Sequence, residues 1–186
     1  MQITCLKENH IKEIILLSDK IFGLNFLTTK CLYQYINSHV HFGFVCTIDK
    51  NIIGYILADN INYNLLKSSF LKDNEWFETA LIGLNNICLI KQIAVAEESR
   101  KQGVANLLIQ KIGGLAETHC CLAWKRGQST PLKNVLLRNN FKFQKTIQEY
   151  WKNDSQMRKY NCSTCGKPPC LCRAEVYFKK KASTIS

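Results

Sequence analysis

Apolar residues recur along the first half of the chain in two patterns, which predict two kinds of element. Over residues 10–23, isoleucine and leucine recur at about helical spacing, and this predicts an amphipathic helix that ends at Gly23. Residues 42–48 and 52–58 are short apolar runs typical of strands. Between them, Asp49-Lys50-Asn51 predicts a hairpin turn because Asp and Asn tolerate tight-turn geometry.

Three further segments complete this half. Residues 2–6 are expected to form a strand, and Thr28-Thr29 supplies the N-cap of a second helix that runs to Ile36. Residues 60–86 show no clean period, so we expect a long excursion with one short helix over residues 76–81.

The second half predicts strands and helices in alternation. The β-branched run 87–96 is typical of a central strand, and the next helix is expected to begin near Gln102. Residues 120–124 predict another strand, and Pro131 suits the first position of the helix that follows. With two strands in the tail, the last of them at 174–180, the order β-α-α-β-β-β-α-β-α-β-β predicts an α/β fold with mixed parallel and antiparallel strands.

The composition is that of a globular protein, with 46% hydrophobic and 21% charged residues among 186. No apolar run approaches the roughly 18 residues that span a bilayer, and no basic segment leads into an apolar block at the N-terminus. We therefore expect a cytoplasmic protein without a membrane partner. Because that compartment is reducing, the ten cysteines are expected to be thiols or metal ligands rather than disulfides.

The turn after the central strand has the features of an anion site. The first N–H groups of the next helix, at residues 101–105, have no intrahelical partner, and the helix dipole favours a negative charge such as a pyrophosphate. Gly103 removes a side chain from the path of a ligand, and Arg100 and Lys101 add positive charge. The same residues also suit an ordinary strand-turn-helix junction.

The sequence of this turn resembles a known signature. Residues 100–105, Arg-Lys-Gln-Gly-Val-Ala, resemble the R/Q-x-x-G-x-G/A signature of the GNAT superfamily of acetyl-CoA-dependent N-acetyltransferases. The strand Ile93-Ala94-Val95 before it and the segment 135–141 (VLLRNNF) after it also match that family, and the resemblance extends over residues 2–151. It implies a GNAT-like, mixed and mostly antiparallel central sheet flanked by helices.

The resemblance also implies roles for individual residues. The backbone of Ile93 and Val95, on either side of Ala94, would pair with the pantetheine arm of acetyl-CoA, and the N–H near Ile93 would steady the thioester oxygen as it becomes an oxyanion. An amine would attack the thioester directly, with no acetyl-enzyme. The pyrophosphate would contact the charge of Arg100 and the backbone of Lys101, Gln102, Gly103, Val104 and Ala105.

Two positions depart from the family pattern. Leu136 stands where many relatives place a tyrosine as general acid, and Trp124 stands near the position of a glutamate that some use as general base. The remaining candidates for proton transfer are Tyr150, expected just before a strand that faces the site, and Glu75 and Glu78 in the long excursion. Each also fits a plain structural role, as a half-buried tyrosine or as solvated charges.

Four cysteines are crowded into a loop at residues 160–173, which we expect to belong to a single domain spanning residues 1–186. An iron–sulfur cluster also accepts four thiolates, but a compact knuckle without an extra apolar shell favours structural zinc, held tetrahedrally at about 2.3 Å from each sulfur. The Pro-rich context argues against a thioredoxin-like redox pair. The ligand spacing is Cys162-x2-Cys165-x4-Cys170-x-Cys172.

The charge leaves two hypotheses for function. The net charge is +11, and residues 142–186 hold ten Lys or Arg against three acidic residues. The leading hypothesis is an N-acetyltransferase that uses acetyl-CoA, carries structural zinc, and takes an amine acceptor, small molecule or peptide, rather than nucleic acid. The alternative is a non-catalytic GNAT-fold binding protein whose zinc knuckle and basic tail bind RNA or an acidic partner.

Overall fold

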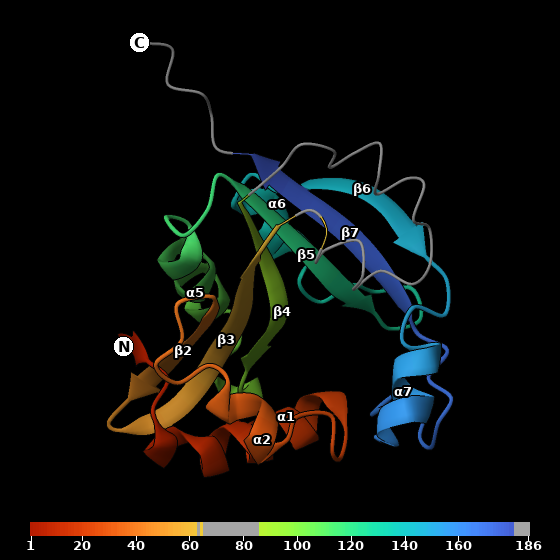
Figure 1. The fold of residues 1–186 in the computed structure, drawn as a ribbon, viewed down its shortest axis with the longest axis horizontal. Helices are drawn as coiled ribbons and strands as arrows, with labels where there is room; N and C mark the ends of the chain where they lie inside the picture. Colours follow the sequence, from red (N-terminus) through yellow and green to blue (C-terminus); the bar gives the residue numbers. More distant parts are fainter. Residues whose placement is uncertain (63, 65–85, 181–186) are drawn as a thin grey trace.

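The structure is a computed structural model that describes residues 1–62, 64 and 86–180, and its described strands form one sheet in the order β1-β2-β3-β4-β5-β7-β6 (Figure 1). Only β4 and β5 pair in parallel among these strands, so the prediction of a mixed, mostly antiparallel sheet is confirmed. The strands are β1 Gln2–Cys5, β2 His41–Ile48, β3 Asn51–Ile61, β4 Ile87–Val95, β5 Thr118–Lys125, β6 Lys142–Ile147 and β7 Arg173–Lys180.

Helices cover both faces of this sheet. They are α1 Ile11–Phe22, α2 Thr29–Tyr33, α5 Val104–Ile112, α6 Lys133–Arg138 and α7 Lys152–Arg158, with 3-10 turns at η1 Glu8–His10 and η2 Glu97–Ser99. In the described part of the chain, no helix has the length and apolar character needed to cross a membrane.

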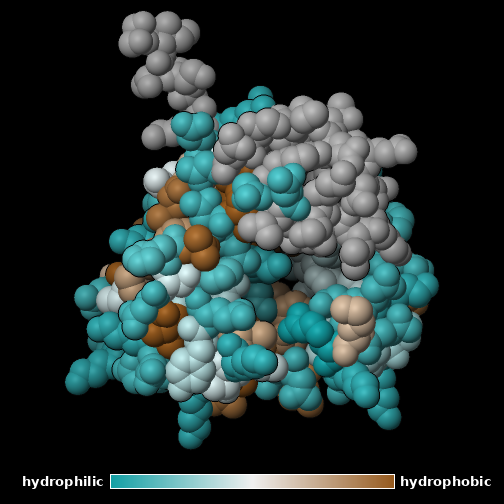
Figure 2. Space-filling view, viewed as in Figure 1, coloured by the Kyte–Doolittle hydropathy of each residue, from teal (hydrophilic) through white to brown (hydrophobic). Residues whose placement is uncertain are grey.

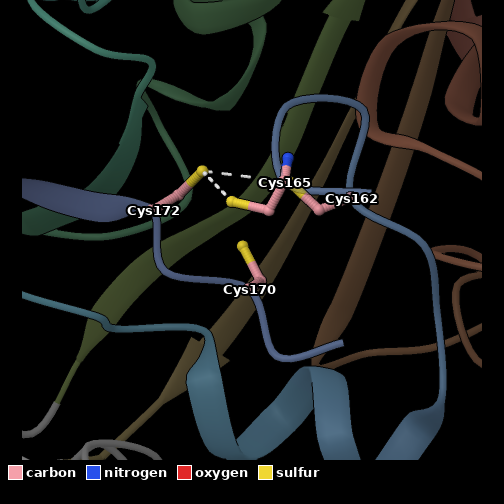
Figure 3. Close-up of side chains that lie close together, drawn as sticks. All are labelled: Cys162, Cys165, Cys170 and Cys172. Carbon is pink, nitrogen blue, oxygen red and sulfur yellow. Dashed lines mark hydrogen bonds between the residues drawn. The ribbon is translucent and has the colours of Figure 1, made fainter. Parts of the chain in front are cut away.

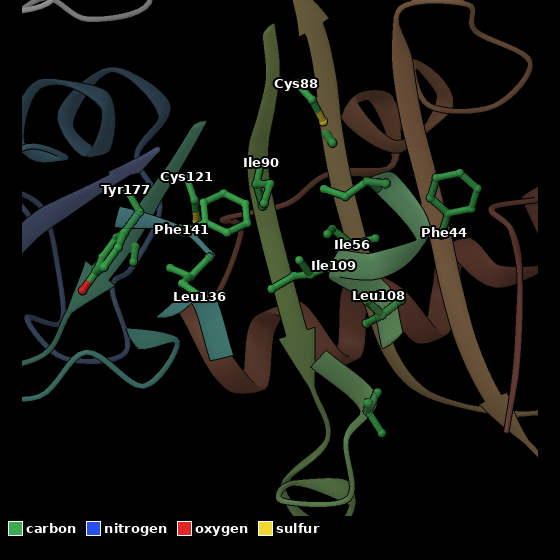
Figure 4. Packing of buried hydrophobic residues seen from close by; sticks show 14 of the residues in the cluster. Phe44, Ile56, Cys88, Ile90, Leu108, Ile109, Cys121, Leu136, Phe141 and Tyr177 are labelled. Atoms are coloured by element: carbon green, nitrogen blue, oxygen red, sulfur yellow. The ribbon is translucent and has the colours of Figure 1, made fainter. Parts of the chain in front are cut away.

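Each central strand is buried on both sides, which explains its continuous apolar sequence. On β3, Tyr55 and Leu57 pack against α1 and α2, while Ile56 and Ala58 pack against α5. Figure 4 shows the α5 side, where Leu108 reaches toward the sheet. The core therefore lies in two layers, with the sheet between them.

Several predicted boundaries are confirmed. Gly23 ends α1 with φ +116°, a conformation that favours glycine. The Thr28 hydroxyl accepts a hydrogen bond from the Cys31 amide at 3.3 Å, which is the expected N-cap of α2. β2 and β3 form the expected hairpin, and its two turn residues, Asp49 and Lys50, both have positive φ.

Other boundaries were predicted wrongly. The second helix ends at Tyr33 rather than Ile36, because the chain continues in isolated turns such as Tyr35 N–H to Leu32 O at 3.0 Å. Pro131 is not the first residue of α6. It lies in a turn closed by Lys133 N–H to Thr130 O at 3.0 Å, and α6 begins at Lys133.

Three further helices differ from the prediction or lie beyond its test. The helix after β4 begins at Val104 rather than near Gln102, because Lys101 and Gly103 take the left-handed φ values +61° and +87°. The sequence pattern did not predict α7. The helix expected over residues 76–81 lies outside the described residues.

Candidate functional site

β4 and β5 separate partway along their length, and this separation creates the candidate site. Their parallel pairing joins only Ile87–Ile90 to Thr118–Cys121, although both strands continue beyond it. At that point the register of β3 on β4 shifts, which leaves Lys91 as a bulge between Ile90 and Gln92. The space-filling view shows the surface hollowed where the two strands part (Figure 2).

Among the described residues, the separated half of β4 has no partner on the side of β5, and its backbone edge there is open. The Ala96 amide donates to Ile53 O at 2.8 Å, toward β3. Because successive residues of a strand direct their N–H groups to opposite sides, the amides of Ile93 and Val95 point away from β3 and toward the separation. Their side chains pack on the α5 side, and Ala94 is buried on the other. Ile93 and Val95 thus present backbone groups to the separation, whereas the amide of Ala94 points toward β3.

The turn between β4 and α5 carries a row of unpartnered amides. Arg100 N–H donates to Glu97 O at 3.2 Å, and Leu107 N–H donates to Gly103 O at 3.0 Å. Within the described residues, none of the six amides between them, at 101–106, has an acceptor. Gly103 faces open space, and the side chains of Arg100 and Lys101 are exposed. This arrangement suits an anion. The predicted contacts to a pyrophosphate stay predictions.

The positions that bear on proton transfer lie in different surroundings. Leu136 is fully buried under the sheet. Tyr150 was expected just before a strand, but it lies in the turn after β6 and is followed by α7. Its ring is 5.0 Å from that of Trp151, edge to face, and burial raises the pKa of its hydroxyl, which therefore stays protonated. Glu75 and Glu78 lie outside the described residues.

The four predicted metal ligands converge between α7 and β7 (Figure 3). Their sulfur atoms all lie within 4.8 Å of one another, and Cys172 Sγ is 3.8 Å from that of Cys162 and 3.4 Å from that of Cys165. Four sulfurs at 2.3 Å from one zinc ion lie about 3.8 Å apart. The donor set therefore fits a single tetrahedral ion, and the space between the sulfurs is too small for a cluster of several irons.

Backbone groups stabilise the first ligand as a thiolate. Cys162 and Gly166 exchange two backbone hydrogen bonds of 2.8 Å, which fold the chain into a tight hairpin. The amides of Thr164 and Cys165 each donate to Cys162 Sγ at 3.4 Å. A hydrogen bond from the Cys170 thiol, together with these amides, lowers the pKa of Cys162 to about 5.

Two tryptophans pack against this site, contrary to the expectation of a knuckle without an extra apolar shell. Trp124 and Trp151 pack against the three buried cysteines, and their ring centroids are 6.4 Å apart. In the sequence, Trp124 stands near the position where some relatives carry a glutamate as general base. Its ring also stacks on Phe22 at 5.7 Å, and the Arg126 guanidinium lies 4.1 Å from its centroid.

The cysteine hairpin closes the end of α1. Ser163 donates twice, from its amide to Phe22 O at 2.9 Å and from its hydroxyl to Ile21 O at 2.8 Å. Arg126 also donates to Ile21 O, at 2.7 Å. These donors satisfy carbonyls that a helix leaves unpaired at its C-terminus. Sequence reasoning missed Ser163 and Arg126, because no local pattern links residues that are more than one hundred positions apart.

A cluster of hydrogen-bonded polar side chains, which the sequence did not indicate, lies where the C-terminal end of β5 meets the N-terminal end of β7. Lys125 Nζ is 2.7 Å from a Glu175 carboxylate oxygen, and the Tyr177 hydroxyl donates to the other at 2.6 Å. Glu175 is buried, which by itself raises its pKa, but these donors and Thr130 outweigh burial and lower it. By contrast, burial raises the pKa of Cys120 and Cys121, so neither thiol is an activated nucleophile.

Comparisons with known proteins concern the fold. No protein-family model and no curated protein sequence matches the chain. Arabidopsis thaliana NAA60 in complex with acetyl-CoA matches with a TM-score of 0.68 at 11% identity, over 96% of this chain and 97% of that one. The ribosomal-protein-S18-alanine N-acetyltransferase from Escherichia coli gives 0.62 at 10% identity, over 96% and 92%. The GNAT-like decarboxylase GphF in complex with isobutyryl-CoA gives 0.65 at 10% identity, over 97% and 99%.

Proposed function

We propose that this chain, which has the fold of the GNAT superfamily, is an acetyl-CoA-dependent N-acetyltransferase. One observation supports this most strongly. The separated edge of β4 is followed, after the turn at 96–100, by the amides at 101–106, which have no acceptor among the described residues, so backbone donors lie both on the sheet and at the start of α5. An extended ligand that ends in a pyrophosphate fits these donors. Two of the similar structures were solved with acetyl-CoA or isobutyryl-CoA.

Different residues of this segment would bind different parts of acetyl-CoA. Ile93 and Val95 would pair with the amides of the pantetheine arm as an added strand does. The amides from Lys101 to Ala105 would hold the pyrophosphate, and the exposed Arg100 would add charge. Acetyl-CoA supplies the thioester carbon that the amine attacks. The amide of Ile93 would then stabilise the oxyanion that forms there.

Two positions at which relatives carry proton-transfer groups hold Leu136 and Trp124 in this chain, and this bears on the mechanism. Leu136 and Trp124 carry no group that moves a proton, so we infer that the acceptor binds as a free amine and that its proton leaves through water. Tyr150 stays the candidate donor to the leaving thiolate. The acceptor in this proposal is a small-molecule or peptide amine.

The second part of the proposal is that Cys162, Cys165, Cys170 and Cys172 hold a structural zinc ion. The sulfur separations and the two amide donors to Cys162 support it. All four positions of a tetrahedral ion would be filled by thiolates, so the ion would have no open position for catalysis.

The cofactor proposal is tested by Gly103→Val. A β-branched residue disfavours φ +87° and would fill the space in front of the amides, so we expect acetyl-CoA affinity to fall about tenfold or more by calorimetry. Gly114→Val is the matched control, because Gly114 also faces open space but lacks a positive φ. Equal affinities of wild type and Gly103→Val would remove this turn as the binding site.

Leu136 and Trp124, at positions where relatives carry proton-transfer groups, also support a second candidate, a non-catalytic binding protein. A panel of peptide and small-molecule amines with radiolabelled acetyl-CoA separates the two. Transfer to any amine supports the enzyme. Acetyl-CoA binding without transfer, together with RNA binding that weakens steeply with salt, supports the binding protein.

A further inference from the structure

One thiol of the four-cysteine site is open to solvent while the other three are not. Cys165 is exposed, whereas Cys162, Cys170 and Cys172 are only 4%, 3% and 7% exposed. The Cys165 sulfur points toward that of Cys172, 3.4 Å away (Figure 3). A small oxidant that arrives from solvent therefore meets Cys165 first, and a partner thiol for a disulfide already lies beside it.

The exposed ligand belongs to the same hairpin that supports α1. Ser163 lies between Cys162 and Cys165 in sequence, and its two hydrogen bonds hold the carbonyls of Ile21 and Phe22. The Asn161 amide adds a third contact, to Leu24 O at 3.0 Å. A rearrangement that draws Cys165 toward Cys172 therefore acts on the segment that follows α1.

That segment borders the side of the site opposite the proposed cofactor turn. Phe22 stacks on Trp124, which belongs to the half of β5 that has separated from β4. Trp124 contacts the cysteines on the α1 side of the sheet, whereas the turn at Gly103 leads into α5 on the other side. Phe22 and Trp124 thus lie across the sheet from the proposed cofactor turn, on the side from which an amine would reach a thioester held along β4 from the α5 side.

We propose that the four-cysteine site is a thiol switch on acceptor binding, in which a peroxide oxidises Cys165 and Cys172 to a disulfide. The metal leaves and the segment after α1 loses its support, while the cofactor site is untouched. The acceptor part of this proposal rests on the proposed acetyltransferase function. The zinc release rests on the proposed structural zinc, whereas the disulfide rests only on the positions of the two sulfur atoms.

The chemistry balances with peroxide as the oxidant. The Cys165 sulfur attacks one peroxide oxygen, so an S–O bond forms, the O–O bond breaks, and the departing hydroxide takes a proton. The Cys172 sulfur then attacks that of Cys165, so an S–S bond forms and the S–O bond breaks with loss of a second hydroxide. Two electrons pass from the sulfur pair to the peroxide. The metal ion loses two of its four ligands and is released.

The test treats metal-loaded full-length protein with one equivalent of hydrogen peroxide. We expect zinc release, measured with a chromogenic chelator, and a Cys165–Cys172 disulfide in peptides mapped by mass spectrometry. Deuterium uptake of residues 21–28 should rise. Acetyl-CoA affinity should change less than about twofold, while the KM for the amine should rise about tenfold. Reduction should reverse these changes once zinc is restored.

Two variants serve as controls. Cys165→His keeps a zinc ligand but removes the exposed thiol, so it should retain zinc under the same peroxide. Cys5→Ser removes an exposed thiol outside the cluster and should respond as wild type does. A disulfide that excludes Cys165, zinc that stays bound after oxidation, or unchanged uptake at residues 21–28 would each overturn the switch. If untreated protein transfers no acetyl group, while peroxide still releases zinc and forms the Cys165–Cys172 disulfide, only the proposed function is refuted.

Discussion

At the scale of single residues, the buried carboxylate of Glu175 shows how strongly its surroundings control its charge. Burial alone raises the pKa of a carboxylate, but Glu175 accepts from Lys125, Tyr177 and Thr130, and its pKa lies below the ordinary value of 4.5. The folded chain therefore binds a proton at this group less readily than the unfolded chain does. Its contribution to stability is complete above about pH 4.5 and is lost as the pH falls through the lower, folded value.

Glu175→Gln tests this contribution. The substitution leaves Lys125 without its anion, so we expect the free energy of unfolding at pH 7 to fall by about 3 kcal/mol. The variant should also lose less stability than wild type between pH 5 and pH 3, because the titrating group is gone. Urea unfolding followed by circular dichroism measures both. Glu117→Gln, at an exposed position, is the control, and an equal effect in both variants would contradict the assignment.

At the scale of elements, α1 and the cysteine hairpin are joined through a glycine. Gly23 has φ +116°, and a Cβ atom on it would lie 1.8 Å from Asn161 O. The close approach of the two backbones is what allows the hairpin to reach the carbonyls at the end of α1.

Gly23→Ala should therefore separate the two elements. We expect the variant to lose at least about 2 kcal/mol of stability, since the backbone conformation and the clash both act against alanine. Hydrogen exchange should show the largest change at residues 161–163. The control is Gly114→Ala, where a Cβ meets nothing and φ is not positive. Unchanged exchange at 161–163 would mean that the hairpin does not depend on this approach.

The sequence predicted those elements whose pattern follows from their own burial. β3 and β4 are covered on both faces, so their apolar runs were recognisable without any knowledge of the fold. The helix α7 was missed because it has seven residues, and only Ser155 among them is buried. The four cysteines were recognisable from spacing alone. Their support by Ser163, Trp124 and Arg126 was not, because those contacts depend on the tertiary fold.

At the scale of the whole molecule, the sheet and the cysteine site have separate hydrophobic clusters, so we expect the stability of the sheet to depend little on the metal. The sheet is buried between α1 and α2 on one face and α5 and α6 on the other, whereas the cysteines form a small cluster of their own with two tryptophans. Metal binding should therefore stabilise the hairpin much more than the sheet.

Cys172→Ser tests this separation. We expect the bound zinc, measured by mass spectrometry, to fall from about one per chain to near zero, and proteolysis to increase within residues 160–173. Far-ultraviolet circular dichroism and acetyl-CoA affinity should stay close to those of wild type. Cys5→Ser controls for the loss of a thiol. If acetyl-CoA binding disappears along with the metal, the hairpin is integral to the core.

The separation of β4 from β5 has a consequence for aggregation. Unpaired strand edges normally lie at the margins of a sheet, where they recruit strands of other molecules. Here, among the described strands, an unpaired edge lies in the interior of the sheet, and the end of β5 lies opposite it. We expect β5 to obstruct a strand that belongs to a second sheet, and to leave room for a single extended chain of narrow cross-section. The fold thus keeps a reactive backbone edge available to a thin ligand while it denies that edge to copies of itself.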